Sequence, residues 1–152
     1  MKKIKSIGLV AHDARKKDIV EWVEFNGKRL GKHKLICTGT TGRLVSEVYE
    51  KKFPDMNVDI VKLKSGPLGG DQQMGALIAD GKLDILIFFI DPMTTQPHDV
   101  DIKALERMCA VYNVVIACTR STADFVISSH IFEEEYSPVV SDYNAYLKRN
   151  VN

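Results

Sequence analysis

The sequence SGPLGGDQQ at residues 65–73 places a single carboxylate, Asp71, directly after a glycine-rich turn and at the predicted start of a helix. Glycines allow a backbone to approach a ligand closely, and the unbonded N–H groups at a helix start attract anions. One loop could therefore hold a phosphate-bearing ligand and direct Asp71 at it. The alternative is that Asp71 only caps the helix, because Asp is among the preferred residues at an N-cap.

A second candidate phosphate-binding turn follows a predicted strand. The sequence TGTTG occupies residues 38–42, so that Thr38, Gly39, Thr40 and Thr41 lie together ahead of a predicted helix. Its glycines leave backbone N–H groups accessible, and its threonines add hydroxyl donors. The lysine and the spacing of a Walker A loop are missing, and an ordinary N-cap turn is the alternative because Thr is also favoured there.

His12 and Lys16 lie one helical turn apart, directly after the first predicted strand. If a helix begins near Asp13, the Lys16 ammonium can point back toward the ends of the strands, and Asp13 is then the predicted cap of that helix. A single histidine is more often structural and a single lysine more often solvated. Beside the threonine-rich turn, however, the pair favours anion binding.

Carboxylates gather between the fourth predicted strand and the next helix. Asp91 follows a buried strand that Pro92 stops. His98, Asp99 and Asp101 come just before a predicted helix, which one of the two aspartates is expected to cap. Such a group could in principle bind a metal. Because no pair has a familiar metal-ligand spacing, acid–base chemistry is favoured and no metal site is expected.

Five apolar, β-branched runs alternate with helical patterns along the chain. The predicted strands are residues 7–11, 35–38, 58–63, 85–90 and 114–118. The predicted helices are residues 16–30, 43–49, 72–80, 102–112, 123–128 and 143–149. The run at 85–90 is apolar throughout, as expected of a strand covered on both faces. The alternation predicts an α/β fold: one domain over residues 1–152, doubly wound, with a mainly parallel five-stranded sheet and helices on both faces.

In such a sheet, ligands bind at the carboxyl ends of the strands. Four of the five segments that follow the predicted strands carry polar, small or ionisable residues of the kind that a phosphate site needs. This convergence favours a small-molecule phosphate ligand more strongly than any single motif does.

Composition argues against several other classes of partner. A net charge of +1 gives no basic field for nucleic acid. The longest apolar run is far too short to span a bilayer, and the basic start of the chain leads into no secretory apolar segment. Cys37, Cys109 and Cys118 show no C-x-x-C spacing, so free thiols in a reducing cytoplasm are expected.

Taken together, these segments resemble the methylglyoxal synthase family. The resemblance is carried by AHD at 11–13, TGTTG at 38–42, SGPLGGDQQ at 65–73, DP at 91–92 and PHD at 97–99, and it runs over nearly the whole chain. It implies conversion of dihydroxyacetone phosphate to methylglyoxal and inorganic phosphate without a cofactor, in a homohexamer. Inorganic phosphate is then also expected to inhibit, because product and substrate share that group.

The resemblance also assigns roles by position. Asp71 is the implied catalytic base, and Asp91 and Asp101 are implied to support the catalytic site. The implied substrate-binding residues are His12, Lys16, Thr38, Gly39, Thr40, Thr41, Ser65, Gly66 and His98. From the chemistry, we expect His98 to donate to the oxygens of an enediolate intermediate.

The C-terminus departs from the family pattern. The family commonly has an arginine there that reaches the phosphate of a neighbouring subunit, but Asn150 stands in that column, with Arg149 just before it. Either Arg149 supplies the contact after a shift of one residue, or the contact is weakened.

Two other functions compete with the lyase. The wider superfamily includes a non-catalytic regulatory domain of the same fold that binds phosphate ligands, and a metal-dependent phosphatase is a weaker third possibility. Several carboxylates near an anion favour the enzyme, because a sensor needs hydrogen-bond donors instead.

Overall fold

The computed structural model describes residues 1–95, 99–143, 146 and 148. Its centre is a five-stranded sheet in the order β3-β2-β1-β4-β5, and every strand pair is parallel. The strands are β1 (Ser6–Ala11), β2 (Lys34–Cys37), β3 (Ile60–Lys62), β4 (Ile85–Phe89) and β5 (Val115–Ala117). The predicted α/β class and the five strands are confirmed.

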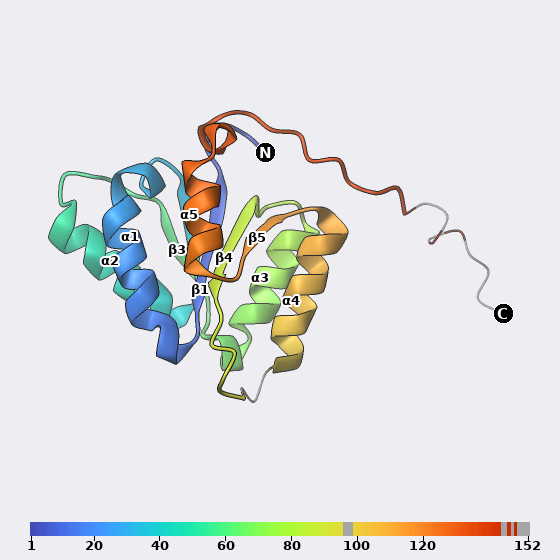
Figure 1. Ribbon diagram of the computed structural model, residues 1–152, viewed down its shortest axis with the longest axis horizontal. Helices are drawn as coiled ribbons and strands as arrows, with labels where there is room; N and C mark the ends of the chain where they lie inside the picture. Colours follow the sequence, from blue (N-terminus) through green and yellow to red (C-terminus); the bar gives the residue numbers. More distant parts are fainter. Residues whose placement is uncertain (96–98, 144–145, 147, 149–152) are drawn as a thin grey trace.

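Helices cover both faces of the sheet (Figure 1). The α-helices are α1 (Lys16–Leu30), α2 (Gly39–Lys52), α3 (Gly70–Ala79), α4 (Asp99–Tyr112) and α5 (Arg120–Ser128). Three short 3-10 helices are η1 (Asp13–Arg15), η2 (Gly66–Leu68) and η3 (His130–Glu133). Helices α1, α2 and α5 lie on one face, and α3 and α4 lie on the other.

Side-chain alternation along β4 divides the core into two layers. Ile85, Ile87 and Phe89 pack with the layer of α1, α2 and α5, whereas Leu86 and Phe88 pack with α3 and α4. All five residues of this strand are buried, which confirms the expectation of a strand covered on both faces.

Helix starts are where the sequence-based boundaries differ most from the structure. Helix α1 has the predicted bounds, but α2, α3 and α4 begin before the predicted residues, at Gly39, Gly70 and Asp99. The first turns of α2 and α3 contain glycine or threonine, and that of α4 contains aspartate; all three have low helix propensity, so these turns resemble loops in the sequence. Residues that look like loops in the sequence are therefore the first turns of helices. The N–H groups of these turns point away from the sheet at its edge.

Two local predictions are wrong or lie outside the described residues. Asp13 is not a helix cap, because it opens the 3-10 turn η1 and α1 begins only after Arg15. The predicted helix at 143–149 does not begin at Tyr143, which has no regular structure. Most of the remaining residues of that segment lie outside the described part of the chain.

The strand register brings the loops after the strands to one edge. Ala11 pairs with Phe89, and Leu9 pairs with Cys37, which in turn pairs with Lys62. The segments that begin at His12, Thr38, Leu63 and Ile90 therefore leave the sheet at the same edge. The strand order reverses direction beside β1, which creates the crevice where ligands bind in open α/β sheets. Within the described residues, no helix is both long and apolar enough to cross a membrane.

Candidate active site

A pocket of about 90 Å³ lies at this edge of the sheet. It is lined by Val10, Ala11, His12, Asp13, Lys16, Thr38, Thr40, Ser65, Gly66, Pro67, Asp71 and Phe88. The structure thus brings together residues from the ends of β1, β2 and β3 and from the first turn of α3. Among the described residues, the segments after these three strands line the pocket, and the segments after β4 and β5 do not.

Asp71 occupies the second position of α3, and Gly69 is the N-cap of that helix. The alternative that Asp71 merely caps the helix is therefore wrong. Its side chain lines the pocket although the residue is only 2% exposed. A buried carboxylate at the wall of a small polar pocket is suited to taking a proton from a bound molecule.

The two candidate phosphate-binding turns are joined through backbone groups. The Gly39 N–H donates to the Lys64 carbonyl at 3.1 Å, and a Cβ on Gly39 would lie 2.8 Å from the Ser65 nitrogen. Gly39 therefore allows the turns to touch, and its own N–H is already used. The N–H groups of Thr40 and Thr41, in the first turn of α2, have no acceptor within the helix and are suited to an anion.

His12 is oriented by the backbone after β4. The Asp91 N–H donates to His12 Nδ1 at 2.9 Å, so Nδ1 is unprotonated and a neutral ring carries its proton on Nε2. The ring of Phe88 meets that of His12 edge to face, with centroids 5.1 Å apart. His12 is thus a buried, oriented side chain in the pocket wall rather than a freely rotating one.

Lys16 points back toward the strand ends, as predicted. Its Nζ donates to the Ala11 carbonyl and, at 2.9 Å, to Thr41 Oγ1. Burial lowers the pKa of Lys16 from its ordinary value, while the charges of Asp13 and Asp71 raise it. The site therefore holds a partly desolvated ammonium beside the Thr41 hydroxyl, an arrangement suited to an anion.

The other predicted acids lie around the pocket rather than in its wall. Asp91 is partly exposed, and its carboxylate accepts from the Met93 N–H at 3.1 Å. Hydrogen bonds from Thr94 and then Met93 hold the pKa of Asp91 below its usual range, so this side chain is ionised. Asp101 and Asp71 line a second, smaller cavity of about 80 Å³ between α3 and α4. His98 lies outside the described residues.

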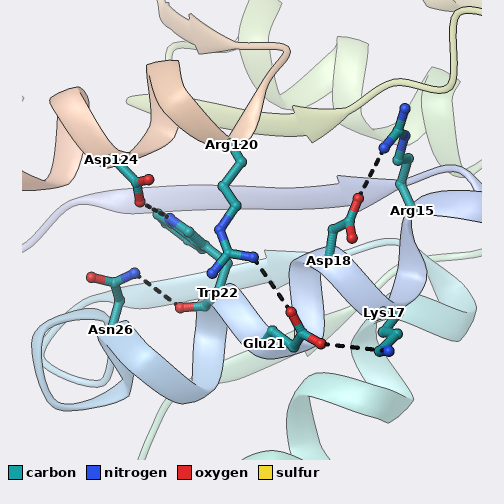
Figure 2. Close-up of polar contacts among 8 residues, drawn as sticks. All are labelled: Arg15, Lys17, Asp18, Glu21, Trp22, Asn26, Arg120 and Asp124. Carbon is teal, nitrogen blue, oxygen red and sulfur yellow. Dashed lines mark hydrogen bonds and ion pairs between the residues drawn. The ribbon is translucent and has the colours of Figure 1, made fainter.

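A polar network anchors α1, the helix that begins with Lys16, against α5 (Figure 2). The buried Trp22 indole donates to Asp124 Oδ1 at 2.8 Å, and Arg120 pairs with Glu21 at 3.4 Å. Arg15 pairs with Asp18 at 3.1 Å within the first turns. These contacts hold the start of α1 at the sheet edge.

Comparison with known proteins decides the family. The family described as "MGS-like domain" matches residues 18–118. A methylglyoxal synthase of Oleidesulfovibrio alaskensis is 51% identical over 149 residues, which cover 98% of this chain and 97% of that protein. The chain belongs to the methylglyoxal synthase family.

Other members of the methylglyoxal synthase family agree over the same length. The methylglyoxal synthase of Leptospira interrogans is 52% identical over 147 residues, or 97% of this chain and 95% of that protein. The crystal structure of the methylglyoxal synthase from Elizabethkingia anophelis superimposes with a TM-score of 0.89 at 49% identity, covering all of this chain and 95% of that one. The family resemblance seen in the motifs is therefore confirmed.

Some wall residues were not predicted as site residues from the sequence. Asp13 was expected to cap a helix but lines the pocket, and Pro67 and Phe88 complete the wall. Asp13 lies next to His12 in the segment that follows the predicted first strand, so its position was the available signal. Among the described residues, no group of three or more His, Cys, Asp or Glu side chains is placed to hold a metal ion.

Proposed function

We propose that this chain converts dihydroxyacetone phosphate to methylglyoxal and inorganic phosphate, a carbon–oxygen lyase reaction that uses no cofactor. The observation that carries the proposal is the buried Asp71 carboxylate in the wall of a pocket that also presents Lys16, His12 and the first turn of α2. That combination offers one base and several anion donors in about 90 Å³, a volume suited to a small phosphorylated molecule.

The first step is proton abstraction. The hydrogens of the substrate's hydroxymethyl carbon are acidic because the adjacent carbonyl can accept the charge. Asp71 takes one of these protons, and an enediolate forms. Hydrogen-bond donors must then stabilise the enediolate oxygens, a role that we assign to His98 together with the Nε2–H of His12. We propose that Asp91 supports this step through its backbone bond to His12, and Asp101 through the cavity that it shares with Asp71.

The second step is loss of phosphate. The carbon–oxygen bond to the phosphate breaks, the enediolate electrons form a new carbon–carbon double bond, and the resulting enol tautomerises to methylglyoxal. This bond breaks readily when it stands perpendicular to the enediolate plane. The groups that hold the phosphate therefore decide the product, and binding geometry is part of catalysis.

Phosphate binding is assigned to the two joined turns and the cation beside them. The residues proposed to bind substrate are His12, Lys16, Thr38, Gly39, Thr40, Thr41, Ser65, Gly66 and His98. Within this set, Lys16 supplies the charge, Thr40 and Thr41 supply N–H groups, and Gly39 allows the turns to meet. Inorganic phosphate should compete for the same groups and inhibit.

We further propose a cytoplasmic homohexamer. All three cysteines are free thiols, which suits a reducing compartment. Exposed apolar side chains, including Val139 and Tyr146, lie along the C-terminal segment and could be covered by a neighbouring subunit.

A turnover assay on dihydroxyacetone phosphate, with and without a chelator, tests the proposal. The lyase produces methylglyoxal and phosphate in equal amounts under both conditions. A non-catalytic phosphate sensor binds the substrate but leaves it intact. A metal-dependent phosphatase releases dihydroxyacetone and phosphate, and loses activity to the chelator until a divalent ion is restored.

A further inference from the structure

The proposed chemistry gives no role to the two glutamines of the SGPLGGDQQ segment, Gln72 and Gln73, and only Gln73 bonds to a neighbouring turn among the described residues. Its side-chain Oε1 accepts a hydrogen bond from the Lys64 backbone N–H at 2.8 Å. We propose that Gln73 is a positioning residue for the reaction, holding Asp71 in register with the phosphate-binding turns. The inference rests on the proposed function, because it assigns Gln73 a task within that site.

The Lys64 backbone connects three elements of the site. Its N–H is bound by Gln73, which lies two residues after Asp71 on α3, and its carbonyl accepts from the Gly39 N–H at the start of α2. Lys64 itself directly precedes Ser65 and Gly66. The Gln73–Lys64–Gly39 bridge therefore links the proposed base to both binding turns through two hydrogen bonds.

Close backbone packing around Lys64 makes the site sensitive to this bridge. A Cβ on Gly70 would lie 2.1 Å from the Lys64 carbonyl oxygen, so the first turn of α3 rests directly on this peptide group. The Gly70 N–H also donates to the Ser65 carbonyl at 2.9 Å. With so little free space, a shift of α3 relative to Lys64 moves Asp71 and the binding turns apart.

Gln73 and Lys64 are both exposed, so water can replace the lost hydrogen bond in a variant. We therefore expect little effect on folding and a larger effect on the reaction. A small displacement changes the distance from Asp71 to the substrate carbon and the angle of the carbon–oxygen bond to phosphate. Misplacements of this kind cost up to about 10²-fold in rate.

The experiment compares Gln73→Met with Gln73→Glu and Gln72→Met. Methionine has nearly the same length and helix propensity but no strong acceptor, whereas glutamate keeps an acceptor oxygen. Gln72 is the exposed neighbour, and among the described residues no hydrogen bond joins it to the binding turns. The readouts are kcat/KM and, in D2O, the ratio of deuterium in recovered substrate to methylglyoxal formed.

We expect Gln73→Met to lower kcat/KM roughly tenfold and to raise the deuterium ratio, because enediolate that cannot expel phosphate takes a proton back. Gln73→Glu should keep the wild-type ratio, and Gln72→Met should match wild type in both readouts. An unchanged ratio in Gln73→Met, or equal effects at positions 72 and 73, would overturn the inference.

A separate measurement distinguishes failure of the inference from failure of the proposed function. If the wild-type protein forms no methylglyoxal, the proposed function is wrong, and calorimetric titration with inorganic phosphate then decides the role of Gln73. Weaker phosphate binding by Gln73→Met than by Gln72→Met supports the bridge. Equal affinities overturn it.

Discussion

At the scale of single residues, Asp71 allows the most direct test. Asn has the same shape and fits the second position of α3, so Asp71→Asn should fold and bind inorganic phosphate. Loss of the general base should lower kcat by about 10²–10⁴-fold. Steady-state kinetics and a phosphate titration measure the two effects. Near-normal turnover would show that another group takes the proton.

Lys16 predicts how activity depends on pH. Only the protonated amine attracts phosphate, and burial lowers its pKa from the ordinary 10.5. As pH rises through this lowered pKa the charge is lost, so kcat/KM, which reports the free enzyme, should fall on the alkaline side at a pH below 10.5.

Lys16→Arg is the matched variant for this pH dependence. Arginine remains protonated throughout the accessible range. Its kcat/KM is expected to be lower overall because the fork fits the Thr41 and Ala11 contacts differently, but the alkaline decline should move upward in pH. The same decline in both proteins would assign it to another group.

At the scale of elements, the first turn of α2 is expected to serve substrate and inorganic phosphate alike. Thr40 is exposed in the pocket wall. Thr40→Ala removes its hydroxyl donor, so KM and the inhibition constant of phosphate should rise together by about 3–10-fold, the loss of one hydrogen bond. Ser46→Ala, farther along α2, is the control. A change in only one constant would place phosphate inhibition elsewhere.

The contact between α1 and α5 (Figure 2) should affect stability through a single hydrogen bond. Trp22 is 1% exposed, so Asp124→Ala leaves a buried indole N–H without its acceptor. We expect a loss of about 1–3 kcal/mol in the free energy of unfolding, measured by urea denaturation with the fluorescence of the one tryptophan.

Two variants control for this effect. Asp124→Asn keeps an acceptor oxygen and should retain most of the stability. Glu21→Ala breaks the exposed ion pairs with Arg120 and Lys17 but leaves the indole bond in place, and it should cost about 1 kcal/mol or less. Equal losses in all three variants would show that the indole bond is not the stabilising contact.

The elements also show what the sequence could predict. Alternating apolar runs identified every strand, and the rule for parallel sheets placed His12, Thr38 and Ser65 at one pocket. The sequence could not show that Asp71 lies inside α3, because glycine-rich first turns have no helical pattern. Nor could it show that the Asp91 N–H donates to the His12 ring or that the Gly39 N–H donates to the Lys64 carbonyl, since main-chain donors leave no mark on side-chain type.

At the scale of the whole molecule, the C-terminal segment exposes several apolar side chains in a single chain. Residues 134–143 run away from the end of α5 and past α4 (Figure 1), where Asn113 donates to the Val139 carbonyl at 2.9 Å. The exposed fractions of Val139 and Tyr143 are 85% and 42%. Such a segment is suited to packing on another subunit, in keeping with the proposed hexamer.

Arg149→Ala and Lys148→Ala test whether this end of the chain joins a neighbouring site. If Arg149 crosses an interface to a phosphate site, its removal alone should alter KM or phosphate inhibition while the oligomer mass is unchanged. If the two cations only complement a helix end, both variants should lose little stability and keep the same KM. Light scattering supplies the mass for each variant.

The main-chain groups of Lys64, finally, predict which substitutions this position tolerates. Its exposed side chain takes no part in the bridge, whereas its N–H and carbonyl join the two turns to α3. A survey of all substitutions should therefore score position 64 as permissive, with proline as the exception because it has no N–H. Lys64→Ala should turn over substrate nearly as wild type does, and Lys64→Pro should not. The role of this position depends on its main-chain groups, so a comparison of side chains between relatives does not reveal it.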